Sequence, residues 1–165
     1  MPRAALLLAL PAALTLAGCC PIPHYQQESP ELNGVLQWNG QPAADVPVTL
    51  AVNEQFGPDC AGSQAQARTD ANGAFHFDRT QYFELAISFG DRRDRWRLCF
   101  ELPDGSRAIW EESDYWGGPP QQALECRVDS REAAPSEPVM LQSVEGEADL
   151  DENTCRVTSI RPTPN

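Results

Sequence analysis

The sequence predicts an all-β fold, a two-sheet antiparallel β-sandwich, and three observations support this prediction. Apolar residues recur at every second position in several short segments, for example 46–52 and 96–102. Gly, Pro, Asn and Asp separate these segments at short intervals. After residue 18, no segment has the 3.6-residue apolar period of a helix. With 165 residues, of which 41% are hydrophobic, the chain can form one domain with a substantial core.

The expected strands lie between residues 32 and 161, and turn residues bound them. Asn39-Gly40 ends the first strand, and the Asp-Ala-Asn-Gly turn at 70–73 leads into the strand that carries Phe75 and Phe77. In the segment 82–89, four side chains are expected to face the core: Phe83, Leu85, Ile87 and Phe89. The predicted strands are 32–38, 46–52, 65–69, 75–77, 82–89, 95–102, 107–110, 123–129, 139–144 (an edge strand) and 154–160.

The first 18 residues have the pattern of a cleaved signal peptide. Arg3 supplies a positive charge, and the apolar run at 4–16 is too short to cross a bilayer. The run ends Leu16-Ala17-Gly18-Cys19, which resembles the lipobox of bacterial lipoprotein signal peptides. This resemblance implies that Cys19 receives a diacylglycerol and becomes the mature N-terminus. The alternative is an ordinary secretory signal that is cut near the same place. Because Cys20 follows rather than Asp, the resemblance also implies a lipid anchor in the outer membrane, facing the periplasm.

Residues 19–31 are expected to form a lipidated tether, because they contain three prolines after Cys19 and show no apolar period. The fate of Cys20 stays open: it can be acylated, bridged to another chain or free. The β-sandwich domain, with a disulfide-stapled C-terminal extension, then spans 32–161. Residues 162–165 form a frayed tail.

Four cysteines follow the tether, and an exported protein is expected to oxidise them in pairs. Three pairings are possible. Cys126 and Cys155 share strand faces with core residues, whereas Cys99 lies beside arginines on an outward face and needs a partner that covers it. Cys60, in a loop, can do so, and we therefore predict the pairs Cys60–Cys99 and Cys126–Cys155. The rival is a four-cysteine metal site, but the chain lacks a C-x-x-C pair, and no metal or other cofactor is predicted.

Residues 34–77 carry a family resemblance. The pattern G-V-L-x-x-N-G-Q-P-x-x-x-V-x-V-x-L, followed by T-D-x-N-G-x-F-x-F, resembles the transthyretin-like (prealbumin-like), carboxypeptidase-regulatory-like β-sandwich domains. The resemblance implies an opening hairpin, a turn into the next core strand, and structural roles for the motif residues. Such domains most often serve as accessory or adhesion modules, so the resemblance implies an architecture and no catalysis. The later strands, the cysteines and the acidic C-terminal part lie outside it.

The charged clusters have simpler explanations than catalysis or ligand binding. A net charge of −12 makes nucleic acid and acidic lipid surfaces poor partners. The acidic segment 149–153 lacks the Gly and Glu of an EF-hand calcium loop, and the arginines of 92–97 alternate with aspartates at a turn. Glu111, Glu112 and Asp114 are expected to point in different directions. Because no Ser/His/Asp triad or phosphate-binding glycine loop is present, no catalytic residue is predicted.

Trp110, Tyr115 and Trp116 form a candidate binding loop, because they surround acidic residues and precede the Gly-Gly-Pro-Pro of 117–120. Aromatic side chains on a loop can stack on sugar or grip a protein. Alternatively, they cap the open end of the sandwich.

These features predict a membrane-anchored, non-catalytic binding or envelope-assembly lipoprotein. Its expected partners are the membrane, through the lipid on Cys19, and an envelope protein or glycan. The alternative is a dedicated protein partner in a secretion or envelope complex. A hydrolase or metal-dependent enzyme is a weaker alternative.

Overall fold

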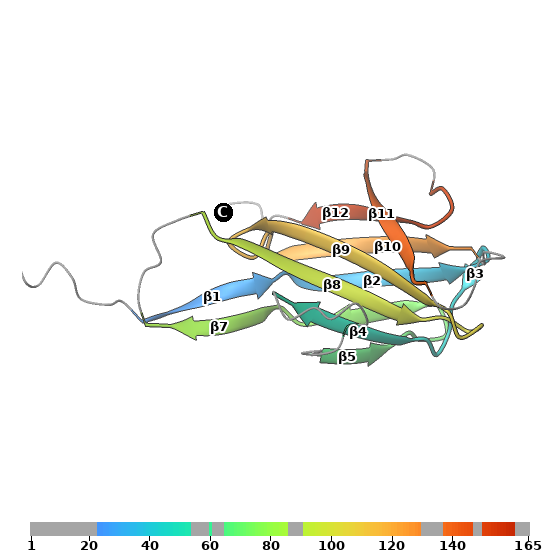
Figure 1. Cartoon of the computed structure of the whole chain (residues 1–165), viewed down its shortest axis with the longest axis horizontal. Helices are drawn as coiled ribbons and strands as arrows, with labels where there is room; N and C mark the ends of the chain where they lie inside the picture. The colour runs from blue at the N-terminus through green and yellow to red at the C-terminus, as the bar shows by residue number, and fades with distance from the viewer. Residues whose placement is uncertain are drawn as a thin grey trace, which may run out of the picture.

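The computed structural model describes residues 23–53, 60, 65–85, 91–129, 137–146 and 150–160. The expected signal peptide, Cys19, Cys20 and the tail at 162–165 lie outside these residues. Within them the chain forms twelve strands and no helix, and hence none long and apolar enough to cross a membrane (Figure 1). The strands are β1 (His24–Ser29), β2 (Glu31–Trp38), β3 (Gln41–Pro42), β4 (Pro47–Val52), β5 (Ala65–Arg68), β6 (Ala74–Phe77), β7 (Thr80–Glu84), β8 (Arg93–Glu101), β9 (Arg107–Tyr115), β10 (Gln121–Val128), β11 (Val139–Glu145) and β12 (Thr154–Ile160).

All strands except β1 and β7 belong to one curled sheet. Its order is β3-β2-β10-β12-β11-β9-β8-β4-β5, and β6 also pairs with β2. Strand β11 is the corner of this sheet, because residues 139–141 pair with β9 whereas residues 142–145 pair with β12. Buried side chains from both sides of the corner belong to one core cluster. The two halves therefore face each other, an arrangement that is compatible with a β-sandwich (Figure 1).

Three pairings in the curled sheet are parallel: β2 with β10, β11 with β12, and β11 with β9. The prediction of a purely antiparallel sandwich is therefore wrong at these places. The prediction of 139–144 as an edge strand is also wrong, because β11 has a neighbour on each side. Apolar alternation shows which face of a strand is buried, but it carries no information about the direction of the neighbouring strand.

The motif residues in and around β2 and β6 hold the backbone together. Gly34 lies opposite Phe75, whose ring occupies the space that a Cβ atom on residue 34 would need. Asp70 Oδ1 accepts two backbone N–H hydrogen bonds within its turn, at 2.8 and 2.9 Å. Gly73, with φ +77°, accepts a hydrogen bond from the Leu36 N–H at 2.8 Å, which ties the turn to β2. These contacts give the conspicuous residues of this segment a structural role.

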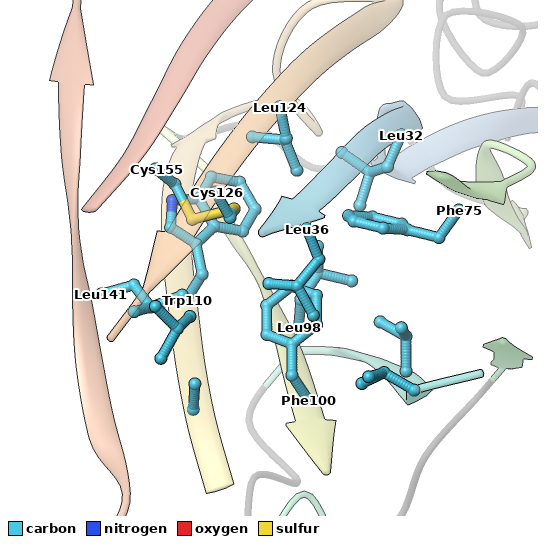
Figure 2. Close-up of a cluster of buried hydrophobic side chains, with 14 of the residues drawn as sticks. Leu32, Leu36, Phe75, Leu98, Phe100, Trp110, Leu124, Cys126, Leu141 and Cys155 are labelled. Carbon is cyan, nitrogen blue, oxygen red and sulfur yellow. A yellow bond between two sulfur atoms is a disulfide. The ribbon is translucent and has the colours of Figure 1, made fainter. Parts of the chain in front are cut away.

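The core contains three fully buried aromatic side chains from the β8–β9 half, Trp96, Phe100 and Trp110, and they belong to one cluster with leucines of β2 and β10. Figure 2 shows Phe100 and Trp110 within this cluster. The Cys126–Cys155 disulfide joins β10 to β12 within this core (Figure 2). The Cys60–Cys99 disulfide lies apart from it, in a small cluster with Ile109. Both pairs are those expected from the strand faces.

Strands β1 and β7 form a separate two-stranded ribbon, which extends beyond the curled sheet at the left of Figure 1. Residues 24–29, expected to be part of an extended tether, instead pair with β7 as strand β1. The expected inward orientation of Phe83 and Leu85 is also wrong, because these side chains are 52% and 63% exposed. The face of β7 that packs is the opposite one, where the Tyr82 ring lies under the Arg92 guanidinium. Ile87 and Phe89 lie outside the described residues.

Candidate binding cleft between β9 and β12

The candidate aromatic loop is smaller in the structure than the sequence predicts. Trp110 is fully buried, and its Nε1 donates a hydrogen bond to Ser143 Oγ at 3.0 Å, so Trp110 is a core residue and not part of a binding loop. The reason is that β9 continues to Tyr115, five residues beyond the predicted end of the strand. Tyr115 and Trp116 remain at the surface, 48% and 45% exposed.

The turn at 116–120 covers the end of the sandwich beside β1. The Gln27 side chain donates hydrogen bonds to the carbonyl oxygens of Gly117 and Pro119, at 2.6 and 3.0 Å. The Trp116 N–H donates to the Arg92 carbonyl at 3.2 Å. The turn is therefore held between β1 and the start of β8 by Gln27 and by backbone hydrogen bonds.

A cleft of about 760 Å³ opens where β9 and β12 lose their common neighbour. Within the described ranges, β11 pairs with β9 only as far as Trp110 and with β12 only as far as Val157. Both strands continue past these points, to Tyr115 and Ile160. We call this opening the β9–β12 cleft, and its polar lining includes Glu112, Ser113, Asp114, Gln122, Glu145, Thr158 and Ser159.

The polar lining of the cleft continues the inward faces of core strands. Glu112 and Asp114 have the same phase along β9 as Trp110, and Gln122 has the same phase along β10 as Leu124. The polar residues therefore replace the apolar core at this end of the sandwich. Polar residues at positions where the alternation predicts buried apolar ones are the sequence signal that could have indicated the cleft. The signal does not show that β9, β10 and β12 meet there.

Three buried polar atoms at this end of the sandwich have no hydrogen-bond partner among the described residues. They are Gln122 Oε1, Asp94 Oδ2 and Trp96 Nε1. Asp94 and Trp96 lie opposite Asp114 and Glu112 in the β8–β9 register, so all four residues share the inner face. Buried polar groups are normally satisfied, and unsatisfied ones concentrated near an opening are typical of a ligand or water site.

The backbone of β9 is open toward the cleft. Ser113 N–H donates to the Glu112 carboxylate at 3.1 Å, and Tyr115 N–H donates to the Asp114 carboxylate at 2.7 Å. The Trp116 N–H donates to the Arg92 carbonyl, on the β8 side. Because backbone N–H and C=O groups alternate between the two sides of a strand, those of residues 113 and 115 in β9 point away from β8. The carboxylates of Glu112 and Asp114 thus accept hydrogen bonds from the N–H groups of residues 113 and 115, which could otherwise donate to a neighbouring strand.

The charges on the cleft lining are mainly negative. Glu112, Asp114 and Glu145 contribute carboxylates. Arg156 also lines the cleft, and its Nη1 bonds Glu125 Oε2 at 2.8 Å. Among the described residues, no three His, Cys, Asp or Glu side chains are grouped as metal ligands. The acidic residue at 149 lies outside them. The cleft therefore favours a positively charged ligand.

Hydrogen bonds lower the pKa values of two carboxyls outside the cleft, Glu31 and Asp104, the latter chiefly through the Ser106 side chain. Glu31, at the start of β2, accepts hydrogen bonds from the side chains of Gln121 and Asn33, and these bonds hold its pKa below the ordinary value. The lowered pKa of Glu31 has only a local effect, because this carboxyl faces solvent.

In comparisons with known proteins, the chain matches no protein-family model and no curated sequence.

Proposed function

We propose that the protein is a lipid-anchored, non-catalytic β-sandwich that binds an extended, basic segment of an envelope protein in the β9–β12 cleft. The observation that carries this proposal is the edge of β9 beyond Trp110, which has no paired strand on the cleft side among the described residues and borders a cleft of about 760 Å³. A peptide would displace the Glu112 and Asp114 carboxylates from the N–H groups of residues 113 and 115. An extended peptide can add to such an edge as a further strand, with its backbone providing affinity and its side chains specificity.

The chemistry of the cleft favours a ligand that donates hydrogen bonds. Its carboxylates, the Gln122 Oε1 atom and the outward carbonyl of Ser113 are all acceptors. A peptide supplies backbone N–H donors, and a lysine or arginine on it adds positively charged donors that pair with the carboxylates.

A glycan fits the cleft less well than a peptide does. Sugar sites use an aromatic ring as a stacking surface, and no aromatic residue lines the cleft within the described part of the chain. Tyr115 lies at the end of β9, where its ring faces the Arg93 guanidinium at 5.1 Å.

The anchor and the location rest on the sequence. The lipobox-like Leu16-Ala17-Gly18-Cys19 supports acylation of Cys19 and attachment to the outer membrane, facing the periplasm. The resemblance of residues 34–77 to transthyretin-like domains supports an accessory module. Mass spectrometry of the protein from membranes tests the anchor: an acylated N-terminal Cys19 is expected, and a mature chain that begins elsewhere without lipid contradicts it.

The cleft is tested with two synthetic peptides and the full-length protein. One peptide is Lys-Thr-Val-Lys-Thr-Val, and the other carries Glu in place of each Lys. We expect the lysine peptide alone to bind in isothermal titration calorimetry. The double variant Glu112→Gln/Asp114→Asn should bind it about tenfold more weakly, which corresponds to about 1.4 kcal/mol.

The matched control removes the same charge elsewhere. Glu137 and Glu152 are exposed, and they precede β11 and β12 at the ends remote from the cleft. Glu137→Gln/Glu152→Gln should leave the affinity unchanged. Equal binding of the two peptides, or an equal loss of affinity in both double variants, would show that only the overall charge is sensed and would remove the proposal.

A further inference from the structure

The β1–β7 ribbon has an apolar face that no other described strand covers. We call it the ribbon face and define it as Tyr25, Phe83 and Leu85, which are 70%, 52% and 63% exposed. Tyr25 and Phe83 lie directly opposite each other, and their rings are in edge contact with centroids 5.4 Å apart. Tyr25 and Phe83 are therefore a contiguous apolar pair, and the exposed Leu85 continues the sequence phase of Phe83 one residue past the end of β7.

The opposite face of the ribbon is polar and attached to the sandwich. Gln26 Oε1 accepts hydrogen bonds from Tyr82 Oη at 2.9 Å and from Arg92 Nη1 at 2.7 Å. The Arg92 guanidinium lies 4.3 Å above the centre of the Tyr82 ring and pairs with the buried Asp94. A third hydrogen bond, from Asn53 Nδ2 to Glu28 Oε1 at 3.0 Å, joins β1 to the residue that follows β4. On the other face, Gln27 has the phase of Tyr25 and bonds the turn at 116–120, so that face is also attached near the sandwich. Farther along the ribbon, Tyr25 and Phe83 remain exposed.

The position of the ribbon in the chain indicates what covers this face. Tyr25 is only six residues from Cys19. Six residues span at most about 20 Å even when fully extended. A lipid on Cys19 therefore holds Tyr25 within about one strand length of the bilayer surface. Aromatic side chains with an apolar body and a polar tip are enriched at this interface.

We infer that the ribbon face docks on the bilayer that holds the Cys19 lipid, with the side chains of Tyr25, Phe83 and Leu85 entering the interface. This inference rests on the proposed acylation of Cys19. Docking would orient the domain on the membrane instead of leaving it on a free tether. It would also add apolar contacts to those of the acyl chains. A second copy of the chain is a poorer occupant, because three half-exposed side chains offer roughly a few hundred Å², against about 800 Å² per partner in a stable interface.

The experiment uses the full-length lipoprotein in vesicles of phosphatidylcholine, with plain or brominated acyl chains. Phe83→Trp places a fluorophore on the ribbon face, and Leu85→Trp provides an independent position. Met140→Trp is the matched control, because Met140 is 53% exposed and belongs to β11. The emission of each added tryptophan is its spectrum minus that of the parent protein. We expect brominated lipid to quench the emission at positions 83 and 85 and to leave that at 140 unchanged.

The outcomes separate the two proposals. Acylated protein with no quenching at positions 83 and 85 overturns the docking and leaves the anchor standing. Unacylated protein overturns the anchor, and the docking falls with it. Emission at 83 that is insensitive to brominated lipid but shifts with protein concentration assigns the face to a second copy and also overturns the docking.

Discussion

Two turn glycines with similar backbone angles have different surroundings. Gly73 has φ +77° and Gly105 has φ +82°, a region that residues with a Cβ atom rarely adopt. A Cβ on residue 73 would collide with the Leu36 carbonyl oxygen, whereas a Cβ on residue 105 would meet nothing within 4 Å. The pair therefore separates the cost of backbone strain from the cost of a collision.

Gly73→Ala should destabilise the protein more than Gly105→Ala. The strain common to both is about 1–2 kcal/mol. Gly73→Ala should cost about 1–3 kcal/mol more, because the turn must move away from β2 and weaken the hydrogen bond between Leu36 N–H and the residue 73 carbonyl. Equilibrium unfolding in urea, followed by tryptophan fluorescence, measures both free energies of unfolding. Equal losses would show that β2 absorbs the collision without cost.

Among the strands, the two disulfides close chain segments of similar length but occupy different surroundings. Their cysteines are 39 and 29 residues apart, so the chain-entropy contribution of each is about 3.5–4 kcal/mol. Cys126 and Cys155 are fully buried in the main core, whereas Cys60 and Cys99 lie in a small separate cluster. Removing the first pair therefore leaves a cavity among large side chains, including Trp110.

Cys126→Ala/Cys155→Ala should lower the free energy of unfolding by more than Cys60→Ala/Cys99→Ala does. The expected difference is about 1–2 kcal/mol, because the core pair loses packing in addition to the cross-link. Urea unfolding of the two variants under the same non-reducing conditions measures it. A larger loss from the Cys60–Cys99 pair would show that burial in the main core does not decide the difference.

The charge of the whole molecule acts differently on the two proposed contacts. The chain has a net charge of −12, and the cleft carries several of its carboxylates. The ribbon face carries no charged side chain, since it consists of two aromatic residues and a leucine. Salt shortens the range of electrostatic attraction from about 10 Å at 0.1 M to about 3 Å at 1 M.

Raising the ionic strength from about 0.1 to 1 M should weaken binding of the lysine peptide to the cleft without releasing the ribbon face from the vesicle. Titration calorimetry follows the peptide, and quenching of Phe83→Trp by brominated lipid follows the ribbon. Peptide binding that does not respond to salt would show that carboxylates do not contribute to recognition. Salt-sensitive quenching would indicate that charged groups, and not the three apolar side chains, make the membrane contact.

Local sequence patterns predicted the features that depend on a residue and its near neighbours. Period-two alternation located most of the strands and their faces, and turn residues such as Asn39-Gly40 marked their ends. The strand faces also led to the Cys60–Cys99 and Cys126–Cys155 pairs. Cys126 and Cys155 face the core, whereas Cys99 lies on the opposite face of its strand, so a bond from Cys99 to either of them would have to pass through the sheet. These features follow from the alternation of side chains across a pleated strand.

Only the tertiary structure decided which strands are neighbours, and the candidate sites depend on that choice. The sequence does not show that β11 changes partner between residues 141 and 142, yet this change opens the β9–β12 cleft. The sequence predicts that Phe83 lies on the apolar face of a strand. It does not show that this strand, β7, pairs with β1 in the expected tether, where Phe83 is exposed. Alternation is a property of one strand, whereas strand pairing depends on contacts between segments far apart in the chain. By itself, the sequence therefore determined the all-β class, most of the strands and the disulfide pairs, while the tertiary structure decided the order, direction and exposure of the strands.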